Sequence, residues 1–186
     1  MTRRELAAIA ALTLFAAAES CPALGASAEG VATLVTEGTI ASVQAAILER
    51  RVSCESVVRA YLERIAHLDQ SVGLHAITVV NADAARLARA LDEGLRSGKP
   101  RGALFCVPVL VKDNIDTQGL ATTGGSVALL HNVPTEDAFI VARLKAAGAI
   151  VLAKTNMAEW AFSPRDSVSS SFGTTANDRW ATIAAC

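Results

Sequence analysis

Aromatic residues are scarce in this sequence, at 4% of 186 residues, and neither charge is in excess. The 17 basic and 18 acidic residues give a formal net charge of −1. A balanced charge offers no electrostatic basis for binding nucleic acid or an anionic membrane. No apolar run approaches the roughly 20 residues of a membrane-spanning helix, so we expect no stable membrane anchor. The 52% hydrophobic content, much of it alanine, suffices for one domain or part of a larger one.

Metal-binding patterns are missing too. Four cysteines are widely spaced without a CxxC pair, and three histidines are isolated: Cys21, Cys54, Cys106, Cys186, His67, His75 and His131. Clustered Cys and His ligands are what a structural zinc site requires, so we predict no metal site. If Cys21 is lost with a leader segment, the three remaining cysteines leave at least one thiol unpaired within the monomer.

Residues 1–28 have the order of features that is typical of a signal peptide. Arg3 and Arg4 form a basic start, residues 6–18 are apolar apart from Thr13, and residues 26–28 read Ala-Ser-Ala, a small-x-small cleavage pattern. The paired arginines also fit a loose twin-arginine signal, and an amphipathic or buried N-terminal helix is the structural alternative. We therefore expect an exported protein, periplasmic or secreted, whose mature part is residues 29–186.

Three segments of the mature part have helical periodicity. Residues 39–50 form the first, Ser53 is a candidate N-cap for the second, and Asn81 is a candidate N-cap for the third. The expected buried face of the third helix contains Ala84, Leu87, Ala88, Leu91 and Leu95. Gly98 and Pro100 are expected to end this helix.

Three apolar segments predict strands. Residues 74–80 are rich in β-branched side chains, while residues 104–111 and 149–153 are nearly continuous apolar runs that suit strands covered on both faces. Residues 136–147 between the last two predict a helix with Glu136 and Asp137 in its first turn. A strand, a helix and a second strand in this order indicate an α/β sheet with helices on its faces.

Lys112 is the residue of greatest chemical interest. It ends the apolar run 104–111 and precedes Asp113 and Asn114, and ligands of α/β sheets bind at the carboxyl ends of strands. Partial burial there would lower the pKa of the lysine and give a neutral amine that accepts a proton. Taken without its neighbours, the same residue is more simply a solvated lysine at the end of a strand.

The neighbouring segments resemble the amidase signature family. The similarity includes these stretches, in order and with plausible spacing: residues 61–65, 85–88, 107–115, 122–126, 143–157 and 171–177. It covers about residues 39–177, and its most specific part is the block around Lys112. The resemblance implies an α/β/α sandwich with a mixed sheet, incomplete here at the C-terminus.

The same resemblance implies amide hydrolysis by a Ser–cis-Ser–Lys triad, with Lys112 as the catalytic base. The substrate would be a small-molecule carboxylic amide, cleaved to an acid and ammonia or an amine, with no cofactor and no metal. A serine hydroxyl attacks only after a base removes its proton, which explains the need for a lysine of lowered pKa.

The sequence departs from the family after Asn177. The family resemblance implies a glycine-rich serine loop there, carrying the cis serine and followed by the nucleophile, and no such loop is found. We interpret Ser126 and the serines of residues 169–171 instead as polar loop residues that hydrogen-bond the backbone. We therefore expect an amidase sequence that stops before its serines and is inactive as given. One alternative is a noncatalytic remnant or binding module, and another is the cytosolic transamidating protein that feeds ammonia to mischarged tRNA.

Overall fold

Three strands form the sheet around which the described residues are arranged. A computed structural model describes residues 28–69, 72–163 and 165–176. The helices are α1 (Ala28–Glu37), α2 (Ile40–Leu48), α3 (Cys54–Leu68), α4 (Ala84–Arg96) and α5 (Phe139–Ala146), with short 3-10 turns η1 (Val127–Leu129) and η2 (Glu159–Ala161). The strands are β1 (Ile77–Val80), β2 (Pro108–Lys112), β3 (Ile150–Thr155), β4 (Val168–Ser169) and β5 (Gly173–Thr174).

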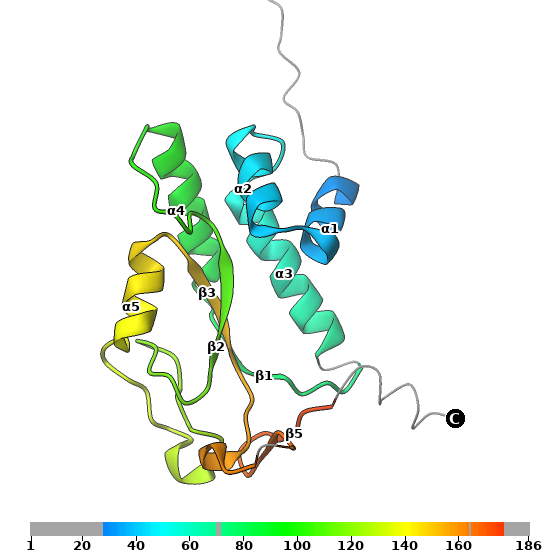
Figure 1. Cartoon of the computed structure of the whole chain (residues 1–186), viewed down its shortest axis with the longest axis vertical. Coiled ribbons are helices and arrows are strands. Elements are labelled where there is room, and N and C mark those ends of the chain that lie inside the picture. The colour runs from blue at the N-terminus through cyan, green and yellow to red at the C-terminus, as the bar shows by residue number, and fades with distance from the viewer. Residues whose placement is uncertain (1–27, 70–71, 164, 177–186) are drawn as a thin grey trace, which may run out of the picture.

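The sheet is mixed, as the family resemblance implies. Its strand order is β1-β3-β2, with β2 parallel and β1 antiparallel to β3. In the parallel pair Val111 lies opposite Lys154 and Lys112 opposite Thr155. The carboxyl ends of β2 and β3 therefore lie side by side. A separate two-stranded hairpin, β4 with β5, follows below this end of the sheet (Figure 1).

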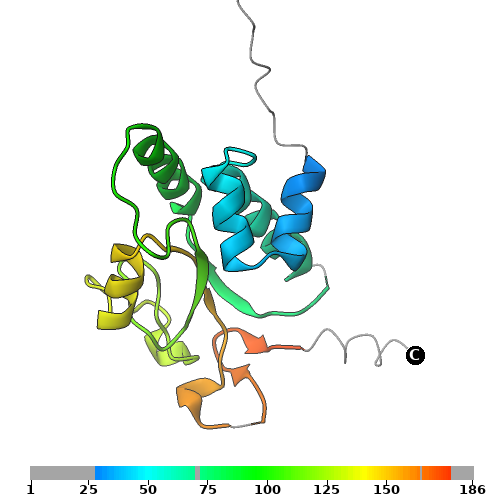
Figure 2. The same ribbon diagram turned by 45° about the horizontal axis from the view of Figure 1, so that its top comes forward.

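Helices cover both faces of the strands. The larger core joins buried residues of α1 to α4 with Ile150 and Leu152 of β3. The smaller core joins Val141 of α5 with Val111 and Val151. Because side chains alternate along a strand, these two cores lie on opposite faces of the sheet. Figure 2 shows the same arrangement, with α1 to α3 on one side of the strands and α5 on the other. In the described residues no helix combines the length and apolar character needed to cross a membrane.

The start of α3 is fixed by two side chains. The predicted N-cap is confirmed, because Ser53 accepts a hydrogen bond from the Ser56 N–H at 2.9 Å. Buried Asp92 of α4 accepts bonds from the backbone N–H groups of Cys54 and Glu55 at 2.8 and 2.9 Å. The first turn of a helix has no internal acceptors for these groups, so Asp92 both caps α3 and joins it to α4.

A disulfide that the sequence analysis does not predict joins Cys54 to Cys106. Both residues are fully buried, with a Cα–Cα distance of 5.8 Å. The bond ties the start of α3 to the turn before β2. Residues 52 positions apart carry no local signal that they meet, so the widely spaced cysteines left their pairing open.

Several predicted boundaries are wrong. The run 104–111 is a strand only from Pro108, because its first residues form a turn, and β2 is not covered on both faces, since Leu110 is 50% exposed. α5 begins at Phe139, so Asp137 lies before the helix and instead bonds Lys145 at 2.7 Å. The N-cap position of α4 is Asp83 rather than the predicted Asn81. The Asn81 side chain still binds the turn before the helix, since its Oδ1 accepts a bond from the Asp83 N–H at 3.0 Å while its Nδ2 donates to the Val151 carbonyl oxygen at 2.7 Å.

Candidate active site

Lys112 is the last residue of β2, directly beside the end of β3. The next residue continues the pairing, since the Asp113 N–H donates to the Thr155 carbonyl oxygen at 3.0 Å. The Ile115 N–H then donates back to the Lys112 carbonyl oxygen at 3.0 Å and closes a turn. The backbone on either side of Lys112 is thus held in place. Its side chain is exposed in the described structure, so the partial burial expected for it is not found there.

Asp113 anchors the loop that follows. Its carboxylate is fully buried and accepts bonds from the Thr123 hydroxyl, from the Thr123 N–H at 3.2 Å and from the Gly125 N–H at 3.2 Å. Gly125 has a φ of +78°, and an added Cβ would lie 3.1 Å from the Cα of Glu159. This glycine is required both by its backbone conformation and by the close approach of the chain.

A second lysine, Lys154, lies buried beneath the same loop. Its side chain is fully buried, and Nζ donates to the Ile115 carbonyl oxygen at 2.8 Å and to Thr122 Oγ1 at 2.6 Å. Asp113 Oδ1 lies 4.0 Å from this Nζ. Burial lowers the pKa of Lys154 to about 8, although the nearby carboxylates of Asp113 and Asp116 act to raise it.

The sequence analysis did not predict that Lys154 is buried and bonded beneath this loop. It treated the residue only as part of the family-like stretch 143–157, and it ended the strand at Ala153. A lysine that directly continues an apolar run was the available signal, because β3 in fact extends to Thr155 and keeps Lys154 inside.

Three of the four serines interpreted from the sequence as loop residues accept hydrogen bonds from backbone N–H groups. Ser126 Oγ accepts a bond from the Ala128 N–H at 3.4 Å. Ser169 Oγ accepts one from the Phe172 N–H at 2.8 Å, and Ser170 Oγ accepts one from the Val127 N–H at 3.1 Å. The Oγ of Ser171 is buried without a partner among the described residues. Within residues 28–69, 72–163 and 165–176, no hydrogen bond joins a serine to the Lys112 amine.

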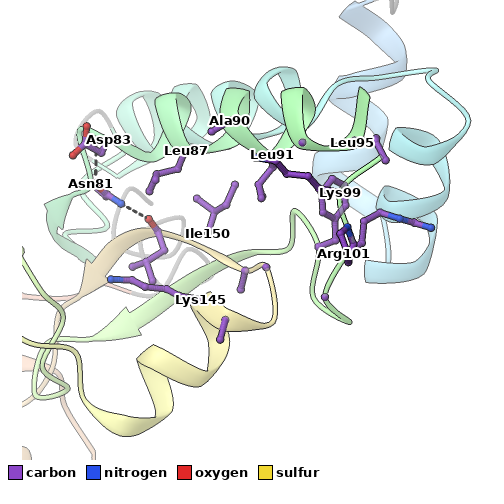
Figure 3. A pocket seen from close by; sticks show the side chains of 18 of the residues that line it. Asn81, Asp83, Leu87, Ala90, Leu91, Leu95, Lys99, Arg101, Lys145 and Ile150 are labelled. Carbon is purple, nitrogen blue, oxygen red and sulfur yellow. Dashed lines mark hydrogen bonds between the residues drawn. The ribbon is translucent and has the colours of Figure 1, made fainter. Parts of the chain in front are cut away.

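Two hollows flank the sheet. One, of about 570 Å³, lies between α4 and β3, where Leu87, Leu91 and Ile150 point toward one another (Figure 3). The other, of about 410 Å³, lies between α3 and the strands, and Pro108, Leu110 and Leu152 contribute to its lining. By strand alternation Leu110 and Lys112 lie on the same face, so the second hollow is on the side of Lys112.

The mixed sheet and its strand-end lysine define an α/β protein of the class whose ligand sites lie at the carboxyl ends of strands. No group of three or more His, Cys, Asp or Glu residues suited to a metal occurs in the part of the chain that the structure describes. Residues 56–184 match the family model Amidase. The chain belongs to the amidase signature family.

Known proteins similar to this chain agree with that assignment. A glutamyl-tRNA(Gln) amidotransferase component from Acidothermus cellulolyticus is 42% identical over 140 residues, which are 75% of this chain and 27% of that protein. The native peptide amidase of Stenotrophomonas maltophilia is 40% identical with a TM-score of 0.71, covering 76% of this chain and 30% of that one.

An amidase family protein from Bacillus anthracis is 34% identical with a TM-score of 0.73, and the match covers 82% of this chain and 32% of that one. The chain therefore spans somewhat under a third of the length of these relatives, and their whole activities do not transfer to it directly.

Proposed function

We propose that this chain is the base-bearing portion of an amidase that cleaves a small-molecule carboxylic amide. The observation that carries the proposal is the position of Lys112, which ends a parallel strand, is followed by the anchored Asp113 loop and lies within the family's lysine motif. Ligands of α/β sheets bind at such strand ends.

In the proposed reaction, neutral Lys112 accepts a proton through a cis-peptide serine from a nucleophilic serine. The serine oxygen attacks the amide carbonyl carbon, and backbone N–H groups stabilise the oxyanion that forms. The C–N bond breaks with protonation of the leaving nitrogen, which releases ammonia or an amine. Water then hydrolyses the acyl-enzyme, which yields the carboxylic acid and restores the serine.

The cis serine of this reaction would belong to the loop that the resemblance places after Asn177, and the nucleophilic serine would follow that loop. The chain as given has no such loop, so we propose that it has no amidase activity by itself. Removing the nucleophile removes the covalent route altogether. Identities of 42% to the amidotransferase component and 40% to the peptide amidase do not separate those two activities, so the proposal stays with amide hydrolysis.

Export is a further part of the proposal. It is supported by the basic start, the apolar core and the Ala-Ser-Ala pattern of residues 26–28, of which all but Ala28 lie outside the described residues. The buried Cys54–Cys106 disulfide also supports it, because disulfides persist in oxidising compartments and are rare in the cytosol. Protein from an exporting host should begin at Glu29 by intact mass. A mature N-terminus at Met1 would contradict export.

The test of activity needs a complete domain. Residues 29–176 joined to the corresponding remainder of the Stenotrophomonas peptide amidase give what we call the completed enzyme. It should release ammonia or amine from simple aliphatic or aromatic amides, and the unmodified chain should not. Lys112→Ala should lower turnover by at least about 10²–10⁴-fold, the range of a lost general base. The matched control is Lys99→Ala, since Lys99 lies exposed after α4.

Two outcomes count against the proposal. A completed enzyme that is folded by circular dichroism and hydrolyses none of the amides would favour the noncatalytic remnant. Turnover by the unmodified chain that Lys112→Ala abolishes would mean that a serine within the chain, such as Ser126 or Ser171, has taken the role of the nucleophile.

A further inference from the structure

The buried polar groups beneath the loop after Lys112 form one connected cluster. This Lys154 cluster consists of Lys154, Asp113, Thr122 and Thr123. Both hydrogen-bond acceptors of Lys154 Nζ lie in residues 113–122, and so does the carboxylate 4.0 Å away. The cluster therefore joins β3 to the ten residues that directly follow Lys112.

Stability does not explain why a lysine occupies this position. Removing an ammonium group from water is costly, and a buried ion pair is often no more stabilising than apolar residues of the same volume. The lowered pKa of Lys154, caused first by burial, agrees with a cost that the surrounding acceptors do not fully offset. Directional hydrogen bonds fix the geometry of the groups that they join, and apolar contacts do not.

The Lys154 cluster holds the backbone turn that directs the side chain of Lys112. Lys154 binds the Ile115 carbonyl oxygen, while the N–H of Ile115 closes the turn onto the Lys112 carbonyl oxygen. Directly after Lys112, the Asp113 N–H donates to the Thr155 carbonyl oxygen, and the Asp113 carboxylate accepts a bond from the Thr123 N–H. If the cluster loosened, the turn that directs the Lys112 side chain would lose its support.

Lys154 does not lie on the face of Lys112. It lies opposite Val111 in the parallel register, and strand alternation places Lys112 on the other face. The carboxylates near it are those of Asp113 and Asp116. A contribution of Lys154 to the reaction would therefore pass through the loop rather than through contact with the substrate.

We propose that Lys154 is a positioning residue that holds Lys112 in its catalytic geometry through Thr122, Ile115 and Asp113. This inference rests on the proposed function, in which Lys112 is the base. It predicts that loosening the cluster lowers the rate of the chemical step and leaves substrate binding nearly unchanged.

Thr122 offers the cleanest variant for the test, because its hydroxyl accepts the Lys154 bond while its backbone is fixed separately. The Thr122 N–H donates to the Asn132 carbonyl oxygen, and Asn132 Nδ2 donates to the Thr122 carbonyl oxygen, both at 2.9 Å. Thr122→Val removes the hydroxyl at nearly constant shape, and Thr122→Ser keeps it. Thr36→Val makes the same chemical change on the exposed side of α1 and serves as the matched control.

In the completed enzyme, Thr122→Val should lower kcat about 10- to 100-fold, the range expected when a reacting group is misplaced, with KM changed less than about twofold. Thr122→Ser should recover most of the lost kcat, and Thr36→Val should behave as the parent. The rate at which acetic anhydride modifies Lys112, followed by peptide mass spectrometry against pH, should change in Thr122→Val and not in Thr122→Ser. This labelling reads the Lys112 amine without requiring turnover.

The outcomes separate this inference from the proposed function. Undiminished turnover by Lys112→Ala would overturn the proposed function itself. If Lys112→Ala is inactive while Thr122→Val keeps the kcat and the Lys112 labelling of the parent, the positioning role of Lys154 is wrong. Thr122→Ala, which cannot clash, serves as a second variant. If Thr122→Val and Thr122→Ala both fail to fold while Thr122→Ser folds, the hydroxyl is structural and the positioning role is also overturned.

Discussion

Lys154 is a lysine whose folded environment disfavours its charge. Its pKa is lowered from 10.5 to about 8, and burial is the main cause. The unfolded chain therefore holds this proton more tightly than the folded chain does. Below pH 8 both states are protonated and the buried charge opposes folding. As pH rises from 8 to 10.5 the folded state loses its proton first, so stability should increase across that window.

This reasoning gives a prediction for pH dependence. In the completed enzyme the free energy of unfolding should rise between pH 8 and 10.5 by up to about 3 kcal/mol from Lys154, at about 1.4 kcal/mol per pH unit. Lys154→Met should lose this rise. Urea unfolding of both proteins at pH 7.5 and 10 measures the difference between them. Equal pH dependence in the two proteins would show that Lys154 is not a buried group of lowered pKa.

Single residues were predictable from the sequence where the signal was local. The block around Lys112 and the backbone bonds of Ser126 and Ser169 could be inferred because they depend on neighbouring residues. The bond of Ser170 to the Val127 N–H spans 43 positions and has no local signal. The burial of Lys154 had a local signal in the apolar run that it continues, but its acceptors could not be inferred, since Ile115 and Thr122 lie 39 and 32 positions away. The expected burial of Lys112 also depends on distant groups, and the described residues leave it exposed.

Among the elements, α3 and α4 are joined by a cap rather than by apolar packing alone. Both carboxylate oxygens of Asp92 accept bonds from the first turn of α3. Asp92→Ala should lower the free energy of unfolding of the completed enzyme by about 1–3 kcal/mol, because it leaves two N–H groups without their acceptor. Asp83→Ala is the matched control at the start of α4, where the carboxylate makes no cap bond and is exposed.

Urea unfolding with tyrosine and tryptophan fluorescence measures both variants. If Asp92→Ala and Asp83→Ala unfold at the same urea concentration, the joint cap contributes nothing and the helices are held by their apolar faces. If Asp83→Ala lowers the free energy of unfolding more than Asp92→Ala does, the assignment of Asp92 as the stabilising cap is wrong.

The existence of most main elements was predictable, whereas α1, the ends of the elements and their cross-links were not. All four predicted helices and three predicted strands are found, because each has its own periodicity or β-branched run. Residues 104–107 look like a strand in sequence but form a turn, where Cys106 has a φ of +56° and is bonded to Cys54. The partner of Cys106 lies 52 positions away, and no local pattern reveals it.

At the scale of the whole molecule, the sheet carries apolar surface that the other described residues leave exposed. β1 and β2 are the edges of the three-stranded sheet, with Val80 46% and Leu110 50% exposed. Phe139 and Phe162 are 81% and 92% exposed. Unpaired strand edges and apolar patches of this kind favour association or aggregation.

We therefore predict that residues 29–186 alone do not form a stable, soluble monomer. Size-exclusion chromatography should show aggregated or associated protein, and circular dichroism should show no cooperative thermal transition. The completed enzyme, in which we expect the remaining part of the domain to cover these surfaces, is the control and should unfold cooperatively. A cooperative transition in a soluble monomer of residues 29–186 would contradict this prediction.

The central claim is that Lys112 acts as a base, and Lys112→Arg in the completed enzyme tests it most directly. Arginine keeps the positive charge and has a side chain at least as long as that of lysine, but its guanidinium stays protonated at any working pH and cannot accept the proton of a serine. Steady-state amide hydrolysis should therefore fall as far as in Lys112→Ala, with the protein still folded. Turnover close to that of the parent would show that Lys112 contributes charge or shape, and that the base is another residue.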